Sequence, residues 1–449
     1  MKKTEPPPLA RRVIGLDAHP DSFTAALLQG ATPAQAIIEK TFDKVPIAKL
    51  QGWARKHTAA QDLIVLEASG NSFQIVRTLA AVERKALVLE SCQVGRLKEA
   101  HANNDKISAV RIGKAYLAGT AKVVWVPDAK TQERRDLFHA HRKAVKRLTQ
   151  TRNRLLSYLS DHGVRLKKGT RLTQTLEGET KLRAAHAWTP SQWRVIEGYL
   201  MELRHASAQR AHWRSLIAQE VLADPKLLQL VRLCGVRELI AFALGAILGD
   251  ITRFSEPRKL VKYIGLNPAF DDSGEGKWHG GISGHGRKDL RTLLVEAAQA
   301  ILRSQNQPLA KWGRKLLARK GVKNLAVAAV ARKLAVSVWY LMMGRWTPLE
   351  EIDAALSMKV GKIISQVGKE RLKLLGKTRQ TLREEICQAL HASRVAPPDP
   401  LPKAAPTPAR APKLPAKAAK VYLLKPTHKF LLKGRSPQTS TVATEKVGE

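Results

Sequence analysis

The stretch Val13–Asp17, VIGLD, is a short apolar run that ends in a carboxylate. A second run, Leu63–Leu66 (LIVL), ends in the same way at Glu67, and a third acid, Asp105, follows in the polar stretch NNDKIS. Short apolar runs of this kind are typical of strands buried in a sheet, and residues at strand ends emerge where loops and sites form. Carboxylates brought side by side repel one another unless a cation lies between them. The three acids are therefore candidates for a metal site.

The pattern around these acids predicts the organisation of the first half of the chain. Short β-like runs alternate with helix-like ones up to about Pro127, which predicts a mixed α/β domain over residues 12–128, preceded by an N-terminal tail at 1–11. Strand signals then vanish, and residues 129–225 show leucines at helical spacing among many Arg and Lys residues. This pattern predicts a basic helical pair or coiled coil, whose charged face either is solvated or contacts nucleic acid.

The second half of the chain predicts a mostly helical domain over residues 226–345. Its segment LCGVRELIAFALGAILGDI places Gly235 in a tight turn between two helix-like runs. The segment resembles a helix-hairpin-helix element, whose turn amides bind a DNA phosphate, although an ordinary buried helical turn has the same pattern. A basic helical extension is expected at 346–395. The Pro-, Ala- and Lys-rich stretch at 396–449 cannot bury a core, so we expect it to be disordered.

A glycine-rich stretch separates two parts of that helical domain. Six glycines fall between Gly274 and Gly286, which predicts a long loop before a helix that begins near Lys288; a flexible surface hairpin is the alternative. Polar glycine-rich loops that open onto a helix are common anion sites. The candidate nucleic-acid-binding residues are Gly235, Arg237, Lys277, Arg287, Lys288 and Arg291.

The overall charge indicates a polyanionic partner. The chain has 77 Lys and Arg against 38 Asp and Glu, a formal net charge of +39, and nucleic acid is the obvious partner for it. No uninterrupted apolar run approaches the roughly 18 to 20 residues that a membrane-spanning helix needs, so we expect no membrane partner. The N-terminus lacks the apolar region of a secretory signal. The three cysteines are far apart and form no CxxC pair, which favours a reducing cytoplasm and argues against a structural zinc site. We expect a cytoplasmic protein associated with the nucleoid.

Together these motifs resemble one family. VIGLDAH, VLEASG and NNDKISA look like the acidic motifs of the RuvC-like DEDD transposases, and the region from GVRELIAFALGAILGD to SGHGRKDLRTLLVEAA looks like that family's C-terminal domain. These proteins are bacterial insertion-sequence recombinases that a bridge RNA guides, and the resemblance covers roughly residues 12–345. It implies an RNase H-like (RuvC-like) domain, a helical coiled-coil insertion and a small domain that carries a nucleophilic serine.

The resemblance also implies roles for individual residues. Asp17, Glu67 and Asp105 would bind Mg²⁺ or Mn²⁺, and Ser273, in the motif DDSG, would attack a DNA phosphate to give a covalent intermediate. Ser283, in GISGHG, is the competing serine. The implied partners are DNA, a structured guide RNA and further copies of the chain, as a homodimer or tetramer.

One position departs from the family pattern. The family's third and fourth acids lie three residues apart, whereas this chain has Ser108 three residues after Asp105. A serine hydroxyl can ligate weakly or orient a bound water, but it adds no charge. Three carboxylates suffice, or the metal binds less tightly, or the protein is inactive. A metal-dependent transposase is therefore our leading hypothesis; a catalytically impaired nucleic-acid-binding relative and a Holliday-junction-type nuclease are the alternatives.

Overall fold

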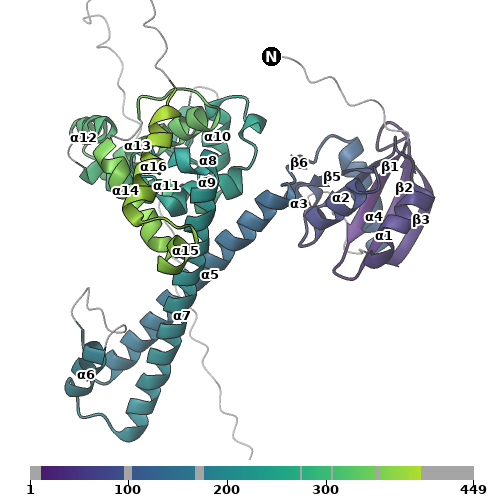
Figure 1. Ribbon diagram of the computed structural model, residues 1–449. Coiled ribbons are helices and arrows are strands. Elements are labelled where there is room, and N and C mark those ends of the chain that lie inside the picture. The colour runs from purple at the N-terminus through teal and green to yellow at the C-terminus, as the bar shows by residue number, and fades with distance from the viewer. Residues whose placement is uncertain are drawn as a thin grey trace, which may run out of the picture. The chain divides into compact units, whose positions relative to one another are not determined.

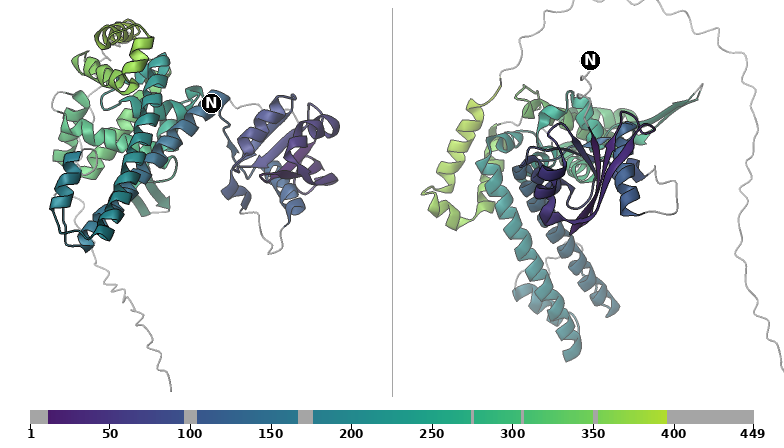
Figure 2. Two further views of the ribbon diagram at one scale, coloured as in Figure 1. Left: turned by 60° about the horizontal axis from the view of Figure 1, so that its bottom comes forward. Right: turned by 90° about the vertical axis from the view of Figure 1, so that its right-hand side faces the viewer.

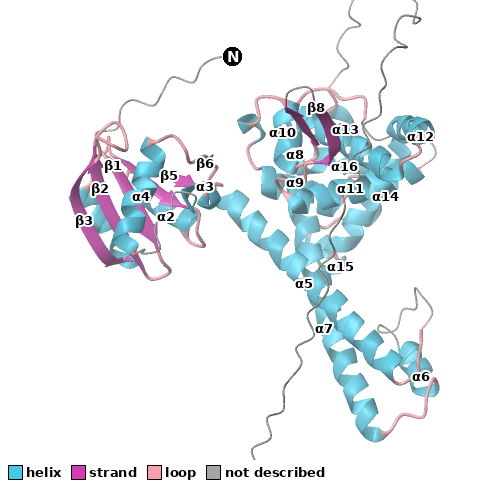
Figure 3. Cartoon of the chain, turned by 180° about the vertical axis from the view of Figure 1, so that it is seen from behind, coloured by secondary structure: helices cyan, strands magenta, loops and turns pink. Residues whose placement is uncertain are grey.

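The computed structural model describes residues 12–95, 104–166, 176–273, 276–304, 307–349 and 353–395. The tails expected at 1–11 and 396–449 lie outside these residues. Within them, a mixed sheet with helices occupies the first part of the chain, and the remainder is almost entirely helical (Figures 1 and 3). The α/β domain and the mostly helical C-terminal region expected from the sequence are both present; the exact domain boundaries stay a prediction.

The sheet has six strands in the order β3-β2-β1-β4-β5-β6. The central strands β1, β4 and β5 are parallel, whereas β2, β3 and β6 each run antiparallel to their neighbour. The strands are β1 (Val13–Ala18), β2 (Ser22–Gln29), β3 (Ile37–Pro46), β4 (Leu63–Glu67), β5 (Lys85–Leu89) and β6 (Val123–Val124). Because β1 and β4 are parallel neighbours, their carboxyl ends emerge at the same edge of the sheet.

Strand alternation divides the side chains of β1 and β4 between the two faces of the sheet. Ile14, Leu16, Ile64 and Leu66 belong to the core that includes residues of α1 (Leu50–His57) and α2 (Ser72–Ala80). The intervening residues Val13, Leu63 and Val65 instead pack with Ile112 and Ala115 of α4 (Asp105–Leu117). Short helical pieces at Ile47–Lys49 and Ser91–Gly95 complete this part of the chain.

The helical pair expected from the sequence consists of α5 (Ala129–Asp161) and α7 (Pro190–Ala223), which lie side by side in Figures 1 and 2. Arg134, near the start of α5, pairs with Glu220 near the end of α7, whereas Thr151 further along α5 donates to Glu202 earlier in α7. The two helices are therefore antiparallel. The short helix α6 (Leu176–Ala184) precedes α7.

The C-terminal region buries its own large core. Its α9 is apolar on all sides and almost wholly buried, which is expected of a helix surrounded by others. The helices are α8 (Pro225–Leu230), α9 (Glu238–Leu248), α10 (Pro257–Ile264), α11 (Lys288–Arg303), α12 (Pro308–Lys320), α13 (Lys323–Met342), α14 (Asp353–Val367), α15 (Lys369–Leu374) and α16 (Arg379–Ala392), with a 3-10 turn at Ile251–Arg253.

The glycine-rich stretch corrects one expectation. In place of a long loop, it forms the hairpin β7 (Pro268–Ser273) and β8 (Gly276–Ile282), so the alternative interpretation was the right one. The β-forming residues Phe270 and Trp278 lie in these strands, and their preference was obscured in the sequence by the surrounding glycines. The helix that follows begins at Lys288, as expected.

One helix, α13, is long and apolar enough to cross a membrane by length and composition alone. Arg332 and Lys333 interrupt its apolar sequence, so no continuous run was visible. Its residues Val330, Leu334 and Val338 are fully buried in the C-terminal core. Its apolar character is therefore explained by packing within the protein.

Candidate metal centre and nucleic-acid interface

Asp17 and Glu67 lie at corresponding positions on neighbouring strands. The parallel register pairs Leu16 with Leu66, and each acid is the next residue of its strand. Alternation puts both acids on the face of the sheet that α4 covers, since Val13 and Val65 already face α4. Both side chains are partly buried. Two acids that are distant in sequence thus lie at the same end of neighbouring strands, although only Asp17 belongs to the cluster described below.

The third acid, Asp105, is the first residue of α4. The side chain of Asn104 caps this helix by accepting a hydrogen bond from the amide of Ile107 at 2.9 Å. The helix can approach β1 closely because position 15 is a glycine: a Cβ on Gly15 would lie only 1.9 Å from the carbonyl oxygen of Ala109. The start of α4, where the helix dipole favours negative charge, is thereby held beside the end of β1.

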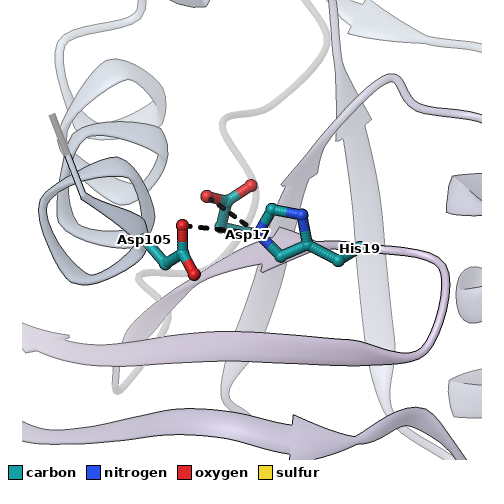
Figure 4. A group of neighbouring side chains, drawn as sticks. All are labelled: Asp17, His19 and Asp105. Carbon is teal, nitrogen blue, oxygen red and sulfur yellow. Dashed lines mark ion pairs between the residues drawn. The ribbon is translucent and has the colours of Figure 1, made fainter.

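A histidine completes the cluster (Figure 4). His19 Nε2 lies 3.5 Å from Asp105 Oδ1 and 4.0 Å from Asp17 Oδ2. One ligand atom from each of the three residues lies within 4.8 Å of the other two. No role was expected for His19 from the sequence, although the pattern Asp-x-His in an extended segment places both side chains on one face. That spacing was the signal that could have identified it.

The backbone of His19 is fixed by the turn between β1 and β2. Its amide donates to the carbonyl oxygen of Ser22 at 2.9 Å. Its own carbonyl oxygen accepts a hydrogen bond from Asn71 Nδ2 at 2.7 Å. Because Asn71 belongs to the segment that follows Glu67, this contact joins the His19 turn to the end of β4.

The donor set fits a divalent cation. Carboxylate oxygens are the ligands that Mg²⁺ and Mn²⁺ favour, and Asp17 and Asp105 supply them within one cluster, with Glu67 on the adjoining strand. Ser108 lies one turn along α4 from Asp105 and is partly buried. Two ionised carboxylates in such proximity repel each other, so a cation at this place would relieve the repulsion.

The two candidate serines belong to the C-terminal region. Ser273 is the last residue of β7 and pairs with Gly276 across the hairpin. Ser283 follows the hairpin, and its amide donates to the carbonyl oxygen of Asn267 at 2.8 Å. The structure thus gathers Asp17, His19 and Asp105, and the role of Ser273 as a nucleophile stays a prediction.

Two of the residues predicted to bind nucleic acid surround the turn between α8 and α9. Gly235 has φ +78°, and a Cβ there would lie 2.9 Å from Ile301 Cγ1, so both the turn and its packing against α11 require glycine. Arg237 is the residue before α9, and its Nε lies 3.4 Å from Oε2 of the buried Glu238. Both positions have a structural role, whether or not they also contact a phosphate.

The other predicted contacts lie around the hairpin and the start of α11. Arg287 donates to both carboxylate oxygens of Asp289, at 3.1 and 2.7 Å. Burial of Asp289 opposes its ionisation, but these hydrogen bonds and the charge of Arg287 hold the pKa of Asp289 below its usual value. Arg291 donates to the carbonyl oxygen of Ile264 at the end of α10. Lys288 is exposed in the first turn of α11, and Lys277 lies opposite Asp272 in the backbone register of the β7–β8 hairpin.

The helical pair has a basic surface. The sequence predicted basic helices over residues 129–225 but did not indicate which of their residues form that surface. A hollow of about 580 Å³ opens between α5 and α7. Its lining residues are Arg147, Gln150, Thr151, Arg154, Met201, Glu202 and His205. Arg147 and Arg154 are exposed and project from the same helix, which suits contact with phosphate groups.

These observations define the class of protein: it has an α/β domain with a candidate divalent-cation site, followed by a basic, mostly helical region. Residues 229–312, from the end of α8 into α12, match the model of the Transposase IS116/IS110/IS902 family. These residues therefore resemble the domain of that transposase family, and the chain has distant homology to transposases of the IS1111A and IS1328 elements.

Three relatives illustrate that distance. The transposase for insertion sequence element IS1111A of Coxiella burnetii is 26% identical over 284 residues, which cover 62% of this chain and 77% of the relative. The putative transposase y4qE of Sinorhizobium fredii is 26% identical over 303 residues, covering 61% and 73%. The transposase for insertion sequence element IS1328 of Yersinia enterocolitica is 22% identical over 331 residues, covering 73% and 95%. The similarity therefore extends well beyond residues 229–312.

Proposed function

We propose that this transposase cleaves and joins DNA strands with divalent cations bound at Asp17, Glu67 and Asp105, and with Ser273 as nucleophile. The observation that carries the proposal is the meeting of Asp17 and Asp105 at the carboxyl end of β1, in a chain whose family acts as transposases. The sheet order, with a central parallel strand that ends in an acid beside a second acidic strand, is that expected of an RNase H-like fold.

The acids and the serine have complementary tasks. Mg²⁺ or Mn²⁺ bound by such carboxylates can activate a nucleophile and stabilise a leaving oxygen. Asp17 is held by β1, Glu67 by β4 and Asp105 by the capped start of α4, so three rigid elements fix the donors. A serine hydroxyl is a weak nucleophile until it is activated, so Ser273 is proposed to act only together with the acids.

The covalent step conserves bonds. Attack by Ser273 Oγ on a DNA phosphorus exchanges one phosphate ester for another: the serine–phosphate bond forms, a sugar–phosphate bond breaks, and the proton passes to the released sugar hydroxyl. A second sugar hydroxyl can reverse the exchange and join a new strand. Strand exchange by this route needs no external energy source, and it needs more than one active site, which supports a homodimer or tetramer.

The nucleic-acid partners follow from charge and family. The net charge of +39 and the exposed arginines along α5 support binding to DNA and to a structured bridge RNA. In a guided enzyme, base pairing selects the sequence and the protein mainly holds the backbone. The basic hollow between α5 and α7 is the proposed place of contact with such a backbone.

The proposal is tested with the full-length protein, its copurifying RNA and a plasmid that carries the ends of the element. We expect Asp17→Asn and Asp105→Asn to lower the rate of strand cleavage about 100-fold or more, because several kcal/mol of transition-state stabilisation would be lost. Ser273→Ala should abolish the covalent protein–DNA adduct, and Ser283→Ala, its matched control, should retain it. Chelation of divalent cations should stop cleavage.

Each alternative has its own outcome in the same assay. A structure-specific nuclease would cut branched DNA and leave no adduct that depends on serine. A catalytically impaired relative, for which Ser108 in place of an acid is the supporting observation, would bind DNA without cutting it at any Mg²⁺ or Mn²⁺ concentration. An adduct that persists in Ser273→Ala and disappears in Ser283→Ala would move the nucleophile to Ser283.

A further inference from the structure

We propose that His19 is a direct ligand of the cation bound by Asp17 and Asp105, so that the centre has a nitrogen donor in addition to its carboxylates. The inference rests on the proposed function, because it concerns the same site. It adds a residue to that site and predicts which cation the site prefers.

The distances between the side chains support this role. An octahedral ion with bonds of about 2.1 Å separates neighbouring donors by about 3 Å and opposite donors by about 4.2 Å. The distances from His19 Nε2 to Asp105 Oδ1 and Asp17 Oδ2 are 3.5 and 4.0 Å, within or close to that range. The imidazole therefore already occupies a place from which it can share an ion with both carboxylates.

The backbone holds the imidazole in that place. Alternation puts Gly15 and Asp17 on the face of β1 that α4 covers, and His19, one residue beyond the end of β1, continues on the same side. The hydrogen bonds to Ser22 and from Asn71 fix the peptide groups before and after His19. The side chain of His19 is 45% exposed, so an ion can reach it from solvent.

The residue at position 108 leaves the site with one charged ligand fewer, and a nitrogen ligand would partly replace it. Ser108 supplies a hydroxyl where the family pattern has a fourth acid, and a hydroxyl contributes no charge. A neutral imidazole is a much stronger donor to first-row transition metals than a hydroxyl, whereas Mg²⁺ and Ca²⁺ prefer oxygen. The centre should therefore favour Mn²⁺ over Mg²⁺ more strongly than a site built only from carboxylates.

A competing explanation is that His19 serves only as a positive counter-charge. In that case a protonated imidazole would balance Asp17 and Asp105 without the ion and would leave when the ion binds. The two roles differ in one measurable property, since only a ligand shares electron spin density with the bound metal.

The experiment is pulsed electron paramagnetic resonance of the full-length protein loaded with Mn²⁺. We expect a nitrogen coupling of directly bound imidazole in the natural protein, its loss in His19→Gln, and its retention in His212→Gln, a matched control at an exposed position on α7. Titration with Mn²⁺ should show binding at least about tenfold weaker in His19→Gln, with a smaller loss for Mg²⁺.

The outcomes separate this inference from the proposed function. Mn²⁺ that binds without any imidazole coupling, or a coupling that persists in His19→Gln, would overturn His19 as a ligand and leave the carboxylate site intact. Unchanged Mn²⁺ binding in Asp17→Asn and Asp105→Asn would instead refute the proposed metal site. If a variant failed to fold, labelling the histidines of the natural protein with ¹⁵N would still decide whether imidazole binds the ion.

Discussion

His141 is a buried histidine that the proposed function does not use. It lies on α5, is 4% exposed, and its Nδ1 has no hydrogen-bond partner among the described residues. Its pKa is lowered from 6.5 to about 4, mainly by burial and also by the nearby charges of Arg214 and Arg210, against the opposing charge of Glu238. Folding therefore keeps this imidazole neutral at a pH where the unfolded chain would protonate it.

This gives the stability of the protein a defined pH dependence. Above pH 6.5 the imidazole is neutral in both the folded and the unfolded state, so it does not change the free energy of unfolding. Between pH 6.5 and 4 only the unfolded state takes up the proton, so stability falls as the pH falls. From pH 7.5 to pH 5 the loss from this residue should be about 2 kcal/mol. The free energy of unfolding, measured with urea, should therefore decrease between pH 7.5 and pH 5 by about 2 kcal/mol less in His141→Gln than in the natural protein.

The exposed His212 provides the comparison for this prediction. His212→Gln should leave the difference between the two pH values as it is in the natural protein. Equal pH dependence of His141→Gln and the natural protein would mean that the buried imidazole does titrate normally.

At the scale of elements, the contact between β1 and α4 decides where Asp105 lies. The added Cβ of Gly15→Ala would come within 1.9 Å of the Ala109 carbonyl oxygen, so the helix would have to move. We expect the variant to lose about 1 to 3 kcal/mol of stability, as overpacked sites do. We also expect weaker Mn²⁺ binding, because Asp105 moves with α4; calorimetric titration and urea unfolding measure the two effects.

The matched control is Gly52, which lies in α1. A Cβ there would meet nothing within 4 Å. Gly52→Ala should leave Mn²⁺ binding unchanged and raise stability by up to about 1 kcal/mol, because alanine is the better helix former. If Gly15→Ala behaved in the same way as Gly52→Ala, the close approach of α4 would not be needed to form the site.

The elements differ in how far the sequence alone revealed them. The strands that carry Asp17 and Glu67 were predictable because a two-sided apolar core requires continuous apolar runs. The helix that begins at Asp105 is one of the helix-like runs expected among the strands. The β7–β8 hairpin was expected only as the alternative to a long loop, because six glycines indicate a loop by composition and only the pairing of residues such as Asp271 with Trp278 reveals the strands.

His19 was missed for a related reason. Its place beside Asp17 and Asp105 depends on the tight turn to β2 and on the hydrogen bond from Asn71, which is distant in sequence. In the same way, Arg135 of α5 reads as a charged surface residue, yet it is buried and donates to the carbonyl oxygens of Ala246 and Ile247 at the end of α9. Such roles depend on contacts between elements that are distant in the chain, and these contacts cannot be predicted from a single sequence.

At the scale of the whole molecule, the excess of positive charge predicts strong binding to nucleic acid of any sequence. Basic side chains release counterions from the phosphate backbone, so affinity falls steeply as salt rises. Binding at a single salt concentration therefore cannot distinguish the residues that contact the backbone from the rest. The slope of log affinity against log salt can, because each phosphate contact on duplex DNA contributes about 0.9 to it.

We expect Arg147→Gln combined with Arg154→Gln to make this slope less steep by about 2, because both arginines line the hollow between α5 and α7. Arg319→Gln with Lys320→Gln removes the same charge from the exposed end of α12 and should leave the slope almost unchanged. Fluorescence anisotropy with a labelled DNA duplex over a range of salt concentrations measures both. Equal slopes for the two double variants would mean that the total charge determines the salt dependence and that the hollow does not contact the DNA backbone specifically. A less steep slope in the α12 variant alone would place the interface at α12.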